Sequence, residues 1–153
     1  MSNELITKSE IDINAPVLKV WDILVNPEQT QKYMFGCKTV SDWEKGSTLT
    51  WEMNHKGKII TAVKGNIIDI QPGTFLVYTT FDPNSDMPDI PENHLTVTYS
   101  LRDKNGTTNL IVTQGDYSKV ADGKKRYDET VEAGGWNSIL IKIKKLAEMI
   151  NEF

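Results

Sequence analysis

Alternating apolar and polar positions predict β-strands along most of the chain. The clearest example is residues 94–103, where every second side chain is large and mainly apolar. Strand patterns of this kind occupy seven segments: 5–14, 37–43, 47–55, 58–71, 74–81, 94–103 and 107–115. Turn-forming pairs such as Lys45-Gly46 and Asn105-Gly106 join most neighbouring segments. Hairpins joined in this way predict an antiparallel sheet.

Two short helices are predicted directly after the first strand. In residues 16–25 the apolar side chains fall on one stripe, as in an amphipathic helix, and Pro16 suits its first position. Asn26-Pro27 interrupts this pattern. A second helix is expected from Pro27 to about Tyr33.

A long helix is predicted at the C-terminal end, from near Asp122 towards Phe153. Its apolar side chains recur at helical spacing. Gly134 and Gly135 interrupt the pattern, and each costs about 1 kcal/mol relative to alanine inside a helix. The expected explanation is a kink or close approach to the sheet, which leaves room for Trp136 to turn inward. The alternative is that one short helix ends at Gly135 and a new helix starts at Trp136.

The order of these elements predicts an α+β fold: a strand, two short helices, about six further strands and one long helix. All of residues 1–153 are expected to form one domain. Gly65, inside a long strand pattern, indicates a bulge or bend. The connection 82–93 contains three prolines and four acidic residues, so it is expected to join no strand ladder. We interpret it as a long mobile loop that is suited to act as a lid.

Composition and charge narrow the class of protein. The net charge is −4, from 21 acidic and 17 basic residues, which argues against a nucleic-acid partner. No apolar run approaches the roughly 18 residues of a membrane span. Cys37 is the single cysteine, so no internal disulfide is expected. The polar N-terminal segment does not have the pattern of a signal peptide, and a cytoplasmic location is therefore expected.

Several segments together resemble a known superfamily. They are "INAPVLKVWDILVNPEQTQKYM", "GSTLTW", "KGNIIDIQPGTFLVYT", "VTYSLRDKNGTTNLIVTQGDY" and "GGWNSILIKIKKLAE". In this order and spacing they resemble the SRPBCC superfamily, whose helix-grip fold includes START lipid-transfer domains and the birch-pollen allergen. Within it, the likeness is to homologues of the heat-shock-protein-90 ATPase activator. The resemblance implies a curved antiparallel sheet of six to seven strands around a long C-terminal helix, with an apolar cavity between them.

The sequence predicts no catalytic residue, metal site or cofactor. His55 and His94 stand apart from each other and from Cys37, without the spacing of a zinc site. No nucleophile elbow or phosphate-binding glycine motif is present. Cys37 is expected to be a buried structural thiol. A cyclase- or hydrolase-like enzyme would require an acid or base in the cavity; the strands and their ends offer Glu52, Asp69, Asp116, His55 and His94 for this role.

The favoured function is non-catalytic binding of a small hydrophobic molecule, lipid-like or aromatic, in the cavity that the resemblance implies. Tyrosine and tryptophan side chains would supply its polar anchors. The residues expected to line this cavity are Trp51, Met53, Phe75, Val77, Tyr78, Phe81, Leu95, Val97, Tyr99, Tyr127, Val131, Gly135, Trp136 and Leu140. A one-residue error in strand register would turn the whole set outward.

Two alternative functions stay open at this point. One is a protein-interaction module related to the chaperone ATPase activators, and the other is the enzyme described above. The sequence does not decide between a monomer and a homodimer.

Overall fold

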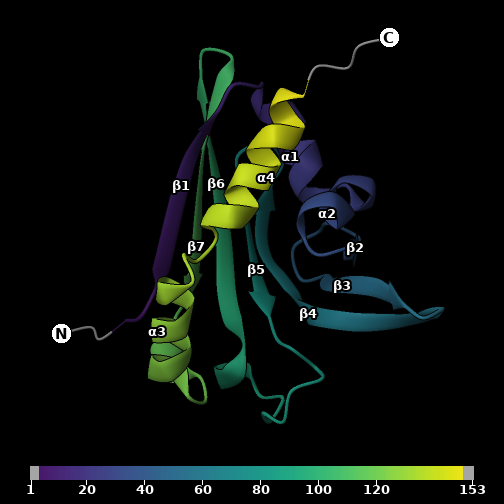
Figure 1. Ribbon diagram of the computed structural model, residues 1–153, viewed down its shortest axis with the longest axis vertical. Helices are drawn as coiled ribbons and strands as arrows, with labels where there is room; N and C mark the ends of the chain where they lie inside the picture. Colours follow the sequence, from purple (N-terminus) through teal and green to yellow (C-terminus); the bar gives the residue numbers. More distant parts are fainter. Residues whose placement is uncertain (1–3, 150–153) are drawn as a thin grey trace.

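The strand patterns form one antiparallel sheet of seven strands in the structure, a computed structural model that describes residues 4–149. The strands are β1 (Thr7–Ile13), β2 (Lys38–Ser41), β3 (Thr48–His55), β4 (Lys58–Gln71), β5 (Phe75–Thr80), β6 (Leu95–Lys104) and β7 (Thr107–Gly115). Their spatial order is β1-β7-β6-β5-β4-β3-β2. The α+β fold class, with a curved sheet of six to seven strands, is confirmed (Figure 1).

The long strand β4 gives the sheet its bend. Its pairing with β3 shifts register opposite Trp51 and Glu52, and its pairing with β5 shifts between Ile67 and Asp69. Between these bulges, Gly65 lies so close to β5 that an added Cβ would be 1.7 Å from the Thr79 carbonyl oxygen. Bulges increase the local twist of a strand. The predicted bend at Gly65 is therefore a close approach between two bulges.

Helices α1 (Val17–Val25) and α2 (Pro27–Tyr33) follow β1, as the sequence predicts. The Asn26 side chain caps α2 by accepting a hydrogen bond from the Glu28 backbone N–H at 3.0 Å. Tyr33 ends α2 inside the core, where its hydroxyl donates to the Leu24 carbonyl at 2.8 Å. This bond joins the two helices at their buried side.

The C-terminal segment forms two helices rather than one continuous helix. They are α3 (Gly123–Glu132) and α4 (Asn137–Glu148). Gly134 and Gly135 have φ angles of +92° and +58°, which end α3, since helix interiors need negative φ. The alternative of a new helix beginning next to Trp136 is therefore correct. The expected end at Phe153 lies outside the described residues.

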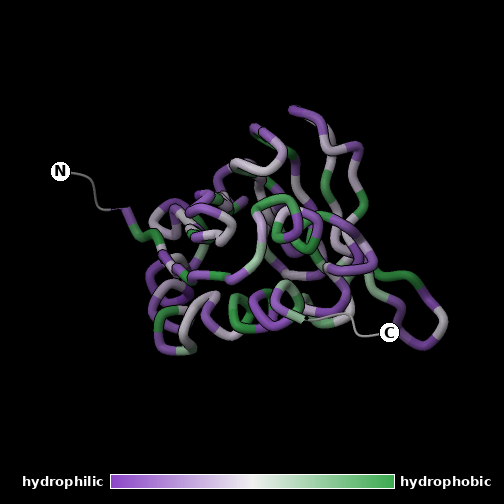
Figure 2. Tube along the Cα trace, turned by 90° about the horizontal axis from the view of Figure 1, so that it is seen from above, coloured by the Kyte–Doolittle hydropathy of each residue, from purple (hydrophilic) through white to green (hydrophobic). Residues whose placement is uncertain are grey.

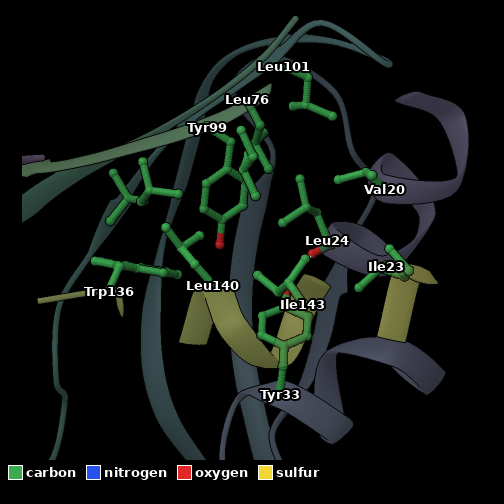
Figure 3. Close-up of a cluster of buried hydrophobic side chains, with 14 of the residues drawn as sticks. Val20, Ile23, Leu24, Tyr33, Leu76, Tyr99, Leu101, Trp136, Leu140 and Ile143 are labelled. Atoms are coloured by element: carbon green, nitrogen blue, oxygen red, sulfur yellow. The ribbon is translucent and has the colours of Figure 1, made fainter. Parts of the chain in front are cut away.

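The core lies between the helices and the sheet. Seen along the long axis, hydrophobic and hydrophilic residues alternate along the trace, as expected for elements with one buried face (Figure 2). On β6 the predicted apolar alternation is confirmed, because Leu95, Val97, Tyr99 and Leu101 are all buried. Figure 3 shows side chains of α1, α2, α4 and the sheet meeting in this core.

No residue of the connection 82–93 lies in a strand, as predicted. It holds a short 3-10 helix, η1 (Pro91–Asn93), and a second one, η2 (Tyr117–Lys119), follows β7. Two contacts attach the loop to β4: Asn84 Nδ2 donates to the Thr61 carbonyl at 3.0 Å, and Asp89 pairs with Lys64. The mobility of this loop and its use as a lid stay predictions.

Candidate functional site

An apolar cavity of about 370 Å³ lies between the sheet and the helices. Its wall consists of Met34, Phe35, Cys37, Trp51, Met53, Ala62, Val63, Tyr78, Thr80, Val97, Gln114 and Trp136. These side chains come from the turn after α2, from strands β3 to β7 and from the residue that precedes α4. Phe35 is 70% exposed, so the cavity reaches the molecular surface beside it.

Four aromatic rings in succession support the inner wall. Ring centroids are 6.3 Å apart for Trp51 and Tyr78, 5.4 Å for Tyr78 and Tyr99, and 5.8 Å for Tyr99 and Trp136. The last two pairs meet edge to face, an arrangement that adds about 1 kcal/mol beyond area burial. All four residues are buried. This part of the wall is therefore a closely packed aromatic surface.

The bulge in β4 adds two consecutive residues to the wall. Ala62 has no partner in β3, since Trp51 pairs with Val63 and Glu52 pairs with Thr61. In a regular strand, neighbouring side chains point to opposite faces, whereas a bulge changes the direction of one of them. Ala62 and Val63 consequently both line the cavity.

Two hydrogen bonds organise the polar groups of the wall. The Trp136 indole Nε1–H donates to Gln114 Oε1 at 2.9 Å. The hydroxyls of Tyr78 and Tyr99 share a bond of 2.7 Å. Of the anchors expected from the sequence, Trp136, Tyr78 and Tyr99 are thus already paired within the protein. For the Trp51 indole, no hydrogen-bond partner is found within residues 4–149.

Burial keeps the titratable groups near the cavity in their neutral forms. It raises the pKa of the Tyr78 and Tyr99 hydroxyls and of the Cys37 thiol, because each charged form would lose its hydration. Of the described residues that line the cavity, none has a carboxylate, imidazole, amine or guanidinium group. The wall is therefore suited to apolar contact rather than to proton transfer.

The predicted cavity residues divide between this wall and other places. Trp51, Met53, Tyr78, Val97 and Trp136 line the cavity. Tyr99 lies behind Tyr78 and Trp136 as part of the core. Leu140 is also a core residue, with 1% of its surface exposed.

Phe75 and Val77 do not line the cavity, contrary to prediction. Along β5, Leu76 and Tyr78 are buried on the core side, so Phe75 and Val77 point to the opposite face. The predicted set included both Val77 and Tyr78, which are consecutive in β5 and therefore point to opposite faces of the sheet.

Phe81 and Leu95 also lie away from the cavity. Phe81 stacks on His94, with ring centroids 4.9 Å apart. Leu95 packs with Tyr117 and Val120 in a separate, smaller apolar cluster. Both residues lie at the ends of β5 and β6 near the loop 82–93, beyond the part of the sheet that borders the cavity.

Tyr127, Val131 and Gly135 line a different cavity, of about 320 Å³. It lies between β1 and the junction of α3 with α4, and Thr7 and Ser9 contribute hydroxyls to its wall. Because the helix is interrupted at Gly134-Gly135, α3 lies beside this second cavity. The prediction that these residues border the apolar cavity is therefore wrong.

Sequence reasoning missed seven wall residues: Met34, Phe35, Cys37, Ala62, Val63, Thr80 and Gln114. Cys37 was correctly expected to be buried, and its apolar neighbourhood was the available signal. Met34 and Phe35 follow α2 in an irregular turn that has no periodicity. No pattern in the sequence reveals the bulge that adds Ala62 and Val63.

The residues considered for acid–base chemistry lie outside the apolar cavity. Glu52 accepts a hydrogen bond from Thr50 at 2.9 Å, and His94 contacts Asp89 at 2.7 Å. Asp116 accepts from the backbone N–H groups of Leu5 and Ser118. Within residues 4–149, no group of three or more potential metal ligands is found.

The raised pKa of the Cys37 thiol leads to a test of its reactivity. Because the thiolate is the nucleophile and only 6% of the residue is exposed, alkylation should be slow in the native protein. At pH 8, iodoacetamide should modify Cys37 at least about tenfold more slowly than in urea-unfolded protein. Mass spectrometry measures both rates, and equal rates would show that the thiol is accessible and unperturbed.

The architecture of the sheet and helices identifies the fold class of the protein. A curved antiparallel sheet, two short helices after β1 and a C-terminal helix over the sheet make up the SRPBCC type of helix-grip fold. Residues 14–148 match the family described as Activator of Hsp90 ATPase homolog 1-like protein, and the chain belongs to this family. The resemblance noted from the sequence is confirmed. Among curated proteins, none matches the chain.

Solved structures share this fold over nearly the whole chain. ChR145 from Cytophaga hutchinsonii is 36% identical, covers 97% of each chain and has a TM-score of 0.73. The Aha1 dimer from Colwellia psychrerythraea is 14% identical, with 94% of this chain and 96% of that one covered, and a TM-score of 0.68. CalU16 from Micromonospora echinospora is 16% identical, with coverages of 94% and 74% and a TM-score of 0.65. The last two show likeness in fold alone.

None of the helices within residues 4–149 combines the length and apolar character needed to cross a membrane.

Proposed function

We propose that the protein binds a small hydrophobic molecule, lipid-like or aromatic, in the apolar cavity and does not transform it. The observation that carries this proposal is an unfilled space of about 370 Å³ with aromatic and aliphatic walls. Small-molecule sites have volumes of roughly 300–1,000 Å³ and mostly apolar walls. Unfilled apolar space costs stability, since its lining loses packing contacts. A ligand that fills the space would recover those contacts.

The chemistry of the wall supports binding rather than catalysis. A general acid or base works best with a pKa near the operating pH. The Tyr78 hydroxyl and Cys37 thiol are the titratable groups among the described wall residues, and burial raises the pKa of both. Both therefore stay protonated at neutral pH, so neither serves as a base.

Filling the cavity from its wall tests this function. Ala62 is half-buried and borders the cavity, so Ala62→Phe places an aromatic ring in the space that the ligand needs. The neutral fluorescent probe N-phenyl-1-naphthylamine should bind the wild-type protein and raise its melting temperature, because a ligand stabilises the state that binds it. For Ala62→Phe, the affinity measured by fluorescence should fall by at least about tenfold.

Ala133→Phe is the matched control, because Ala133 is exposed on the turn between α3 and α4 and borders neither cavity. This variant should bind the probe like the wild-type protein. Circular dichroism checks that both variants fold. The proposal is wrong if the wild-type protein binds neither this probe nor any member of a broad lipid-like and aromatic library.

A second candidate function is protein interaction. It is favoured by the exposed side chains of Phe35, Val40 and Ile59, of which Val40 and Ile59 line a surface groove near β2 and β3. The family description includes activation of the Hsp90 ATPase. Purified Hsp90 should then hydrolyse ATP faster with the wild-type protein than with an Ile59→Ser variant. An unchanged rate with the wild-type protein would exclude this role.

A further inference from the structure

We propose that the ligand of the apolar cavity is an uncharged molecule with a carbonyl oxygen, which accepts a hydrogen bond from Gln114 Nε2. This inference rests on the proposed binding function and specifies its ligand class. It follows from the hydrogen bond between Gln114 and Trp136, which fixes the orientation of one amide group on a mainly apolar wall.

The indole determines which end of the amide is available. Trp136 Nε1–H is a donor only, so the atom of Gln114 at 2.9 Å is the acceptor oxygen, Oε1. Trp136 is 7% exposed and packs edge to face on Tyr99, so it holds this position. The Gln114 side chain therefore presents its nitrogen, which has two N–H donors, away from the indole.

No group within residues 4–149 accepts a hydrogen bond from Gln114 Nε2. The described residues also contain no side-chain nitrogen or oxygen that is fully buried and lacks a partner. Nε2 is consequently in contact with free space. The cavity that Gln114 lines is the apolar one, and the neighbouring polar cavity does not include it. The donor is therefore available to a ligand in the apolar cavity.

The remaining wall groups determine the rest of the ligand's chemistry. The Tyr78 hydroxyl is paired with Tyr99 at 2.7 Å. No described wall residue has a positive charge, so a ligand carboxylate placed next to Gln114 would be buried without a counter-ion, which is costly. A neutral carbonyl satisfies the amide donor without that cost. Ketones, aldehydes, esters and amides with large apolar groups belong to this class.

Two ligands of matched size test this proposal: 2-acetylnaphthalene, which has the carbonyl, and 2-isopropylnaphthalene, which lacks it. The wild-type protein should bind the ketone about fivefold to tenfold more tightly, the effect of one hydrogen bond to an otherwise unpaired donor. In Gln114→Met, which keeps the length of the side chain but removes the donor, this ratio should fall to near one. Isothermal titration calorimetry measures both affinities.

The ratio of the two affinities distinguishes loss of the hydrogen bond from loss of folding, because a general loss of structure weakens the binding of both ligands. Gln71→Met is the control, since Gln71 is exposed at the end of β4 and outside this cavity. Trp136→Phe removes the indole donor and frees the amide to rotate, so it should reduce the preference while the hydrocarbon still binds. If the wild-type protein binds both ligands equally, the carbonyl inference is overturned and the proposed function stands. If it binds neither while the fluorescent probe binds, the carbonyl inference is overturned and the proposed function again stands; if the probe and the library also fail to bind, both are wrong.

Discussion

Replacing Leu140 with alanine should lower the free energy of unfolding by about 3 kcal/mol, as for other buried leucines. Leu140 is 1% exposed on the face of α4 that joins the core with Ile143. The substitution removes buried apolar surface and leaves a space that rigid neighbours fill only in part. For a chain of this length, the melting temperature should fall by about 6–12 °C. Urea unfolding and calorimetry measure these changes.

Probe affinity should stay near the wild-type value in Leu140→Ala, because Leu140 does not line the apolar cavity. Ile141→Ala is the control on the same helix. Ile141 is 49% exposed, so its loss should cost less than about 1 kcal/mol. A Leu140→Ala variant with unchanged stability but weakened probe binding would return Leu140 to the cavity wall, where the sequence had placed it.

The fold was predictable because most elements carry their own pattern. The alternation on β6 and the stripe on α1 correspond to faces that are buried in the structure. Asn26-Pro27 divides α1 from α2 at the expected position, since the asparagine caps the second helix and the proline begins it. Periodicity and helix caps involve only a few consecutive residues, so they can be recognised from the sequence.

The cavity wall was less predictable because it depends on contacts between distant segments. The orientation of the Gln114 amide depends on its hydrogen bond with Trp136, which lies 22 residues further along the chain. The bulge at Ala62 arises from the pairing of β4 with β3 at Trp51, and no residue type in the sequence indicates it. Within β5, the sequence did not decide whether Val77 or Tyr78 faces inward, because both residues suit a half-buried strand.

The two glycines before Trp136 illustrate this limit. Their cost inside a helix was evident from the sequence, but a kink and a complete break have the same local signature. In the structure both have positive φ, and α4 begins anew after Trp136. The break allows α3 to lie beside the second cavity while Trp136 turns towards the first. Gly134-Gly135 therefore separates two cavities instead of opening one.

Replacing Gly65 with alanine should lower the free energy of unfolding by more than about 4 kcal/mol, which is exceptional for a single substitution. The new Cβ would lie 1.7 Å from the carbonyl oxygen of Thr79 and 2.5 Å from its carbonyl carbon. Both are backbone atoms, so no side-chain rotation relieves the contact. β4 and β5 would have to separate, and this would break the paired bonds between Lys64 and Phe81, which are 2.9 and 2.8 Å long.

Gly57→Ala distinguishes this clash from the ordinary effect of losing a glycine. Gly57 has a φ of +83° with nothing within 4 Å of an added Cβ, so alanine there costs only the left-handed backbone strain, about 1 kcal/mol. Gly65→Ala should therefore unfold at a much lower temperature than Gly57→Ala in calorimetry, or fail to fold. Equal melting temperatures for the two variants would mean that β4 and β5 separate at little cost, and the bend would then not depend on glycine. A severe loss confined to Gly65 would show that the close approach of these strands, which positions Ala62 and Thr80 on the cavity wall, requires a residue without a side chain.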